Sequence, residues 1–336
     1  MSASNPTVVF PKPKEIVIED RPVPDPREGE VLVKTQVTLV SAGTELTILS
    51  GDFPRDSEWS KYGQFPFVPG YSNVGEVVRL GKGSDEGLMG KRIVNRGPHA
   101  MYVAAQADSP RIVPDSVSDE QAAFFTVAEV SLNGVRRSKV SLGESVVIFG
   151  AGLIGQFAAR FCRLSGAIPV FVVDVSDDRL SKLPQDPDVV RLNPLRGDVA
   201  SAVESGTSGR MADLVFEVTG DPGLIPGEFK CLRRQGRFVL LSSPRGPTLF
   251  DFHDLCNKPS HTIIGAHLTS QLKRGTPDNP WTSKRESELF FHMVGAHELA
   301  PEQLVTHRVS YQQAPEMYRA LLRDRSEAMG VLIGWT

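Results

Sequence analysis

The segment from Ser145 to Cys162 reads SVVIFGAGLIGQFAARFC, and it constrains the fold more than any other stretch of the chain. A continuous apolar run comes first, as is typical of a strand buried on both faces of a parallel sheet. Gly150, Gly152 and Gly155 follow, and the residues after them have the apolar spacing of a helix. This order of strand, glycine-rich turn and helix predicts a βαβ arrangement built on a parallel sheet.

The spacing Gly-x-Gly-x-x-Gly in this setting predicts a turn that binds a dinucleotide. Gly150 permits the tight turn, Gly152 lets backbone approach a pyrophosphate, and Gly155 lets the helix pack closely on the strand. Leu153 and Ile154 open the helix, whose free N–H groups and positive dipole end favour phosphate. The five residues are therefore predicted to bind the cofactor.

The next apolar run, PVFVVD, ends at Asp174, nineteen positions after the last glycine of the motif. A carboxylate there accepts hydrogen bonds from the adenine ribose and repels a 2′-phosphate. Two more acids follow within four residues and would also repel a phosphate. Arg179, five residues after Asp174, argues against this preference, because a cation there could bind a 2′-phosphate. Thr219, at the end of ADLVFEVTG, completes the predicted cofactor-binding set. The pattern favours NAD over NADP, and a domain of this kind that binds no nucleotide stays open as an alternative.

The chain changes character along its length. Short β patterns broken by Pro and Gly fill the first hundred residues and predict a small antiparallel β-barrel-like unit. A helix is predicted after Ser118, with Gln121 as its capping-box partner. Alternating strand and helix patterns then predict a doubly wound parallel sheet. The C-terminal segment reads as strand, helix and strand, and returns to the first domain. The predicted domains are 1–127 with 268–336, and 128–267.

Composition excludes several classes of protein. The chain is 40% hydrophobic with a formal net charge of −3 and no basic stripe, which argues against nucleic acid and anionic membranes as partners. Its cysteines, Cys162, Cys231 and Cys256, lie far apart without a CxxC pair, which excludes a disulfide framework and a four-thiolate zinc site. No apolar run has the length of a membrane span and the N-terminus lacks an export pattern. We expect a cytoplasmic homodimer, paired through the second domain, that acts on a small molecule.

The segments VLVKTQVTLVSAGTE and PFVPGYSNVGEVVRLGKG, followed by the glycine motif, resemble the medium-chain dehydrogenase/reductase superfamily. The resemblance covers nearly the whole chain. It implies an α/β protein with a GroES-like β-rich catalytic domain, formed from both termini, and a Rossmann doubly wound parallel sheet between them. SAGTE, GYSNVG, PHA and AEVSLNGV look closest to a zinc-less branch that includes bacteriochlorophyllide hydroxyethyl dehydrogenases.

Zinc members of that superfamily bind their catalytic metal through three segments. At the matching positions this chain has Ala42 in place of a cysteine, Tyr71 and Ser72 in place of a histidine and a glutamate, and Thr126 near the third ligand. Zinc needs thiolate, imidazole or carboxylate ligands, which these residues do not provide. The segment for a structural zinc is also absent. The resemblance therefore implies a member without catalytic or structural zinc.

Without the metal, side chains near its place must move the proton. Tyr71 is the first candidate, either as a hydrogen-bond donor to the substrate oxygen or as a ring that fills the vacated volume. Thr44 matches a hydroxyl that relays the proton in zinc members. Glu45 matches an acid that is more often a structural partner than a catalyst. Glu129, one turn past the third ligand position, should be buried and perturbed or paired. His99 is placed on a loop that borders the site, as a proton shuttle or as an exposed histidine without a role.

These observations predict an NAD-dependent oxidoreductase of a secondary alcohol in a polar biosynthetic intermediate, such as a sugar or cyclitol. Two alternatives stay open. One is a reductase of activated C=C bonds, against which Asp174 counts, because such zinc-free members mostly prefer NADPH. The other is a nucleotide-binding protein without turnover.

Overall fold

The computed structural model describes residues 4–108 and 110–336. The chain divides into two compact units. The first unit contains the chain up to Thr126 together with Lys273–Thr336, and the second unit is Val127–Leu272. Within the described part of the chain, no helix is long and apolar enough to span a membrane.

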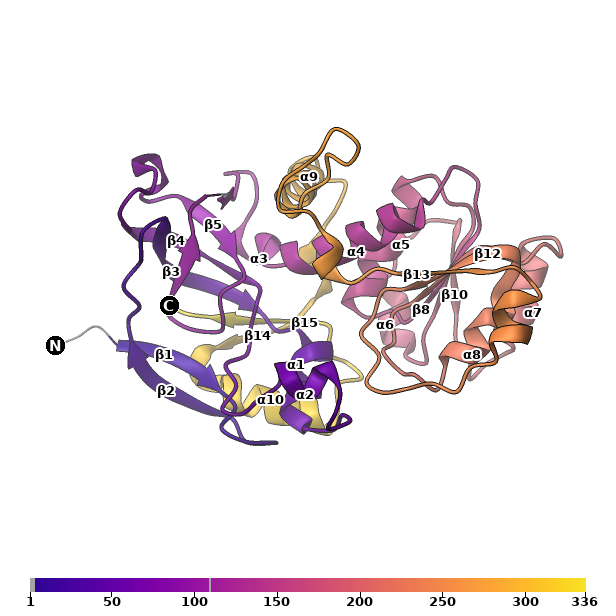
Figure 1. Cartoon of the computed structure of the whole chain (residues 1–336), viewed down its shortest axis with the longest axis horizontal. Helices are drawn as coiled ribbons and strands as arrows, with labels where there is room; N and C mark the ends of the chain where they lie inside the picture. The colour runs from indigo at the N-terminus through magenta and orange to yellow at the C-terminus, as the bar shows by residue number, and fades with distance from the viewer. Residues whose placement is uncertain (1–3, 109) are drawn as a thin grey trace. The chain divides into compact units, whose positions relative to one another are not determined.

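The first unit is rich in β-structure (Figure 1). A separate antiparallel pair joins β1 (Ser4–Val9) to β2 (Val17–Pro22). The larger sheet runs in the order β14 (Val305–Ser310), β15 (Gly330–Gly334), β3 (Glu30–Leu39), β4 (Asn73–Leu80), β5 (Arg92–Asn95) and β7 (Arg111–Ile112), and β6 (Tyr102–Gln106) also pairs with β3. Its α-helices are α1 (Ala42–Ser50), α2 (Glu58–Tyr62), α3 (Asp119–Ala122), α9 (Ser283–Gly295) and α10 (Ala314–Arg323).

One apolar core fixes α10 in the first unit. Ala314, Tyr318 and Leu321 are buried on one face of this helix, since residues four and seven positions apart fall on the same side. The Tyr318 ring meets Phe10 edge to face, with ring centroids 5.2 Å apart. Burial of each large side chain contributes roughly 2–3 kcal/mol. The packing thus holds the C-terminal helix against the N-terminal strand.

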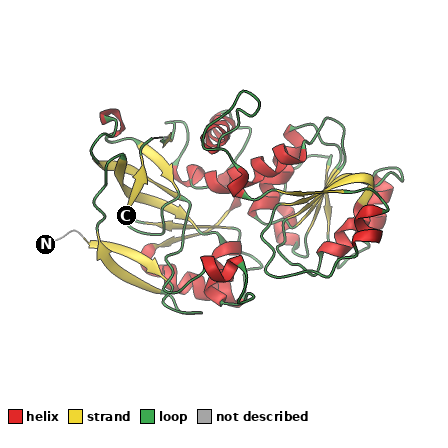
Figure 2. Cartoon of the chain, viewed as in Figure 1, coloured by secondary structure: helices red, strands yellow, loops and turns green. Residues whose placement is uncertain are grey.

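The second unit is a six-stranded parallel sheet with helices on both faces (Figure 2). The strands run in the order β10 (Val189–Leu192), β9 (Val170–Val173), β8 (Val146–Phe149), β11 (Ala212–Glu217), β12 (Leu232–Leu240) and β13 (Thr262–Gly265). The helices are α4 (Phe125–Ser138, whose first two residues belong to the first unit), α5 (Leu153–Leu164), α6 (Asp177–Ser181), α7 (Val199–Gly206) and α8 (Ile225–Glu228). In chain order this is the 3-2-1-4-5-6 arrangement of the Rossmann fold.

The predicted fold class is confirmed: a β-rich unit accompanies a parallel, doubly wound sheet. The capping box at α3 is also confirmed, since Gln121 N–H donates to the Ser118 hydroxyl at 3.2 Å. The antiparallel pairing predicted for the first hundred residues is confirmed, since β1 pairs with β2, and β4 with β3 and β5, in opposite directions. The C-terminal segment, predicted as strand, helix and strand, adds a different pairing. Strands β14 and β15 pair in parallel, because α10 connects them as a crossover.

Candidate functional site

The glycine-rich turn of the second unit has the geometry that its sequence predicts. Gly150 has φ 109°, a conformation that other residues rarely adopt. A Cβ at Gly155 would lie 1.8 Å from the Gly150 carbonyl oxygen, so only glycine allows this close packing of α5 on the turn. A Cβ at Gly152 would meet nothing within 4 Å. The backbone at Gly152 is therefore the part of the turn that a ligand can approach.

Helix α5 starts directly at this open point. Its N-cap residue is Gly152, and no side chain caps the helix there. The first N–H groups of a helix have no partner within the helix, and they carry the positive end of its dipole. Leu153 and Ile154 are the first residues of this uncapped helix, and their binding of a phosphate stays a prediction.

Asp174 follows β9, and its carboxylate is hydrogen-bonded to the backbone of the glycine-rich turn. One oxygen, Oδ2, accepts a hydrogen bond from Ala151 N–H at 2.7 Å, and Oδ1 accepts one from Ser176 N–H at 2.9 Å. A carboxylate oxygen has room for a second donor, so a ribose hydroxyl can still be bound. Arg179 Nη1 lies 4.0 Å from Oδ2. The geometry alone therefore does not separate NAD from NADP.

Glu217 organises the loop after β11, and sequence reasoning missed it. Its Oε1 accepts the N–H and the hydroxyl of Thr219, each at 2.6 Å, and the Gly220 N–H at 2.9 Å. Its Oε2 accepts the Ser242 hydroxyl. The Thr219 hydroxyl is thus held within the loop, since it also accepts the Asp221 N–H at 3.0 Å. The signal in the sequence is a lone acid at the end of an apolar strand.

A second buried acid, Glu228 on α8, lacks such partners. Its side chain is 2% exposed, and neither carboxyl oxygen has a hydrogen-bond partner among the described residues. Burial, and then the nearby charges of Glu217 and Asp221, raise the pKa of Glu228 to about 9. At neutral pH this carboxyl group is protonated.

In the first unit, Tyr71 takes part in a cluster of three hydroxyl groups. Its phenol oxygen bonds to the Ser41 hydroxyl and lies 3.3 Å from Thr44 Oγ1. Burial, together with the charge of Glu45, raises the pKa of Tyr71 to about 12, although the bonds to Ser41 and Thr44 oppose this. The phenol therefore keeps its proton at neutral pH and is suited to donate a hydrogen bond.

The segments expected to carry metal ligands lie together but do not offer the donors. The Thr126 hydroxyl donates to the Tyr71 carbonyl oxygen at 3.1 Å, and Tyr71 bonds to Ser41, the neighbour of Ala42. The Ser72 hydroxyl donates to the Ala123 carbonyl oxygen at 2.6 Å. Within residues 4–108 and 110–336, no group of three or more His, Cys, Asp or Glu side chains is arranged to hold a metal ion. These residues do not fit a catalytic zinc.

Glu45 and His99 lie behind this cluster, in the interior of the first unit. The Glu45 carboxyl group accepts the Tyr318 hydroxyl and lies 3.2 Å from His99 Nε2. The other ring nitrogen, Nδ1, lies 2.7 Å from Thr38 Oγ1. The expectation that His99 borders the site on an accessible loop is wrong, because its side chain has no exposed surface. Its ring is held by the polar groups of Glu45 and Thr38.

Glu129 lies on α4 in the second unit. Its predicted burial is confirmed, since the side chain has no exposed surface. The backbone oxygen of Glu129 accepts a hydrogen bond from Gln271 Nε2 at 3.3 Å. A direct role in proton transfer stays a prediction.

Two residues of the first unit, Ser41 and Tyr318, make contacts in this cluster that the sequence did not predict. Ser41 was passed over because serine before a helix usually caps it, and its partner lies thirty positions away. Tyr318 lies in a segment with no motif, and only its apolar helical spacing marks it as buried.

Comparisons with known proteins agree with this architecture. The family model described as Zinc-binding dehydrogenase matches residues 154–279. The chain is 30% identical over 265 residues to L-threonine 3-dehydrogenase from Xanthomonas euvesicatoria pv. vesicatoria (strain 85-10), covering 69% of this chain and 76% of that protein. It is 23% identical over 367 residues to L-galactonate-5-dehydrogenase from Escherichia coli (strain K12), covering 99% of each. The crystal structure of 2R,3R-butanediol dehydrogenase from Bacillus subtilis is similar with a TM-score of 0.81 and 21% identity, covering 98% of this chain and 99% of that chain.

Proposed function

The chain belongs to the zinc-binding dehydrogenase family of the medium-chain dehydrogenase/reductase superfamily, and on that premise we propose that it interconverts a polar secondary alcohol and its ketone with a nicotinamide cofactor. Its relatives are dehydrogenases of L-threonine, L-galactonate and 2R,3R-butanediol. Each of these compounds carries a secondary hydroxyl among other polar groups. That chemistry supports a small polyol, sugar or hydroxy acid as the substrate.

The second unit is the cofactor domain in this proposal, and the first unit is the catalytic domain. The supporting geometry is the open turn at Gly152 beside the uncapped start of α5. A pyrophosphate at this point gains backbone hydrogen bonds and the favourable helix dipole. When bound, the nicotinamide ring supplies or accepts the hydride.

NAD is the proposed cofactor. Asp174 supports it, because the carboxylate has acceptor capacity for the ribose hydroxyls and its negative charge opposes a 2′-phosphate. The ion pair with Arg179, at 4.0 Å, offsets part of this charge. The preference is therefore expected to be clear but not absolute.

The reaction proceeds without catalytic zinc in this proposal. The observation that carries it is the three-hydroxyl cluster of Ser41, Thr44 and Tyr71, because Tyr71 stands where the family resemblance implies a metal-binding histidine. A phenol that keeps its proton can polarise a carbonyl group and donate to the developing alkoxide. Tyr71 thus supplies the proton for ketone reduction, and the buried Glu45 holds the surrounding helix.

Tyr71→Phe tests the proton donor, because it keeps the ring and removes only the hydroxyl. The assay follows nicotinamide absorbance with NAD and L-threonine, L-galactonate, sorbitol and 2R,3R-butanediol, with the matching ketones and an enone in the reverse direction. Turnover is expected to fall about 10²-fold or more, whereas turnover would stay nearly unchanged if the Tyr71 ring only fills space. Glu129→Gln is made beside it, since it alters a buried acid while keeping its shape.

Elemental analysis of the same protein tests the absence of zinc. Less than stoichiometric zinc, with activity unchanged by a chelator, is expected. About one zinc per chain, lost together with activity on chelation, contradicts the proposal. Turnover of the enone alone would assign the chain to C=C reduction instead.

Two copies are proposed to pair through β13, the terminal strand of the second unit's sheet. An edge strand leaves backbone groups available, and a two-fold axis lets two such strands pair with each other. Ile263 on β13 is 39% exposed and Phe252 nearby in sequence is 67% exposed. Ile263→Lys is expected to yield monomer in light scattering, and an unchanged dimer would contradict this interface.

A further inference from the structure

Ser41 occupies the N-cap position of α1 but does not cap the helix. Serine is among the preferred residues there because its oxygen accepts an N–H of the first turn. In this chain no such bond forms, and the hydroxyl bonds to the Tyr71 phenol instead. The helix thus gives up a favourable cap, and the Ser41 hydroxyl is available to Tyr71.

We propose that Ser41 is a positioning residue that orients the Tyr71 phenol and passes its proton to and from water. This inference rests on the proposed function, in which Tyr71 is the proton donor. It assigns the role to a serine that lies one position before the family's first metal-ligand position.

The surroundings fix Ser41 in the required orientation. Its N–H donates to Glu45 Oε1 at 3.0 Å, so the acid four residues later holds the backbone. Glu45 is 1% exposed and accepts the Tyr318 hydroxyl. The Ser41 backbone is thus held by Glu45, while its hydroxyl bonds to the Tyr71 phenol.

Ser41 also has the exposure that a proton relay needs. Its side chain is partly exposed, whereas Glu45 behind it is buried. Thr44 Oγ1 is also near the phenol, but at 3.3 Å it makes the weaker contact. Thr44 and Tyr71 are partly exposed as well, and we assign the connection with solvent to Ser41 because its hydroxyl makes the shorter contact with the phenol.

In ketone reduction, the carbonyl carbon would gain a hydride from the C–H bond of a bound, reduced nicotinamide, and the electron pair of the C=O π bond moves to oxygen, which takes the Tyr71 proton. The resulting phenolate takes the proton of the Ser41 hydroxyl, and Ser41 takes one from solvent. One hydride and one solvent proton are consumed for each alcohol formed. Alcohol oxidation reverses these transfers.

Labelled tyrosine tests the contact without any substrate. The chain has five tyrosines, so a 13C label at Cζ gives a simple spectrum in which Tyr71→Phe identifies the Tyr71 signal. Ser41→Ala is expected to shift the Tyr71 signal, and Ser41→Thr to restore it in part. Ser50→Ala is the matched control, because it removes a hydroxyl at the other end of α1 that bonds to the Thr47 carbonyl oxygen. An unmoved Tyr71 signal in Ser41→Ala overturns the proposal.

Steady-state kinetics test the proton relay. The substrate is a compound that the protein turns over in the absorbance assay. Ser41→Ala is expected to lower kcat about tenfold, which corresponds to one hydrogen bond, with little change in KM. Ser41→Thr should recover most of the loss, and Ser50→Ala should show none. A slower kcat in heavy water is expected for the unaltered protein, with a smaller effect in Ser41→Ala.

The outcomes separate the two proposals. Normal kcat and an unchanged solvent isotope effect in Ser41→Ala overturn the relay, while a strong loss in Tyr71→Phe still supports the proton donor. Normal turnover in Tyr71→Phe overturns the proton donor and the relay together. If no compound is turned over, the proposed function fails, and with it the relay, even if the labelled spectrum supports the contact.

Discussion

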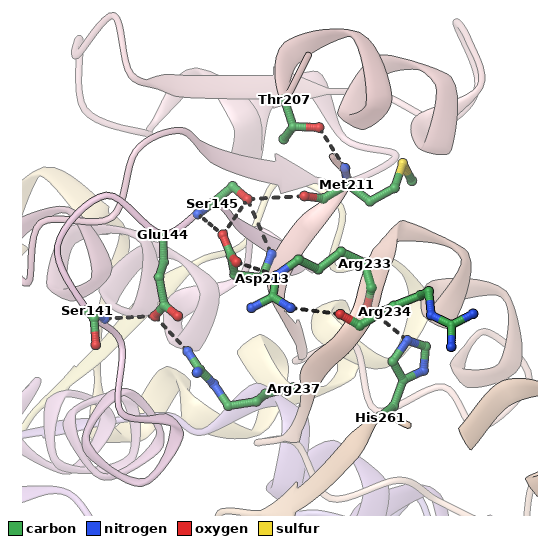
Figure 3. Close-up of polar contacts among 10 residues, drawn as sticks. All are labelled: Ser141, Glu144, Ser145, Thr207, Met211, Asp213, Arg233, Arg234, Arg237 and His261. Carbon is green, nitrogen blue, oxygen red and sulfur yellow. Dashed lines mark hydrogen bonds and ion pairs between the residues drawn. The ribbon is translucent and has the colours of Figure 1, made fainter. Parts of the chain in front are cut away.

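The two edges of the parallel sheet in the second unit differ in how far their polar groups are paired within the chain. At the amino edge, Figure 3 shows charges that pair with one another: Arg233 Nε lies 2.5 Å from Asp213, and Arg237 Nη2 lies 2.6 Å from Glu144. Asp213 also accepts the Ser145 N–H at 2.8 Å. At the carboxyl edge, the start of α5 has no capping side chain.

This difference indicates which edge stabilises the unit and which can bind a ligand. Pairs formed within the chain satisfy their own charges and need nothing from outside. Backbone N–H groups at an uncapped helix start gain a partner only from water or a ligand. In open parallel sheets, ligands bind outside the carboxyl ends of the strands, and the distribution of paired groups agrees with that rule.

Gly155→Ala should have the largest effect, at the carboxyl edge. Its Cβ would lie 1.8 Å from the Gly150 carbonyl oxygen, so the helix or the turn has to move. We expect a loss of stability of at least about 3 kcal/mol and no measurable nucleotide binding. Urea unfolding and calorimetric titration with NADH measure the two effects.

Gly152→Ala is the matched control for that variant. Its Cβ meets nothing within 4 Å, so stability should change little while NADH binding weakens. If both variants lose the same stability, the space above Gly152 is not free, and the assignment of this point to a ligand is wrong.

Glu228→Gln should stabilise the protein, and the gain should depend on pH. The pKa of Glu228 is raised by burial from 4.5 to about 9. Below pH 4.5 the group is protonated in the folded and the unfolded chain, and folding loses nothing. As the pH rises toward 9, only the unfolded chain ionises, so the stability of the folded state falls. Glutamine removes this loss.

The expected gain is at most about 3 kcal/mol at pH 7 and near zero at pH 4.5. Thermal unfolding of both proteins across this pH range measures it. A gain of the same size at every pH would show that the effect is one of packing and not of protonation.

The sequence predicts the parallel sheet of the second unit better than it predicts the buried contacts of the first unit. The parallel sheet and its glycine-rich turn were predictable because continuous apolar runs and fixed glycine spacing depend only on neighbouring residues. The burial of His99 and the Ser41–Tyr71 bond were not, since their partners lie far away in the chain. Strand β10 was also missed, because its VVRL run is interrupted by Arg191 and lacks the glycine-rich turn that follows β8.

Asp174→Ser should have a moderate effect on cofactor choice. It removes the charge that opposes a 2′-phosphate and leaves Arg179 without this acidic neighbour. We expect the ratio of the NADPH and NADH dissociation constants to fall about tenfold, which corresponds to about 1.4 kcal/mol. Fluorescence titrations with both cofactors measure it. Equal constants in the unaltered protein would contradict the NAD assignment before any substitution is made.

Asp213→Asn should have the smallest effect, at the amino edge, and it tests the other half of the comparison. Burial opposes ionisation of Asp213, but the bonds from Arg233 and Ser145 outweigh it and hold the pKa of Asp213 below its ordinary value. The stabilisation from this ionised form is present above the unfolded pKa and is lost as the pH falls through the folded one. We expect a loss of about 1 kcal/mol at pH 7 that shrinks under acidic conditions. NADH binding should stay unchanged, because Asp213 lies near the start of β11 and the glycine-rich turn follows the end of β8. If Asp213→Asn weakens NADH binding as much as it weakens folding, the two edges are coupled and the division between a stabilising edge and a binding edge fails.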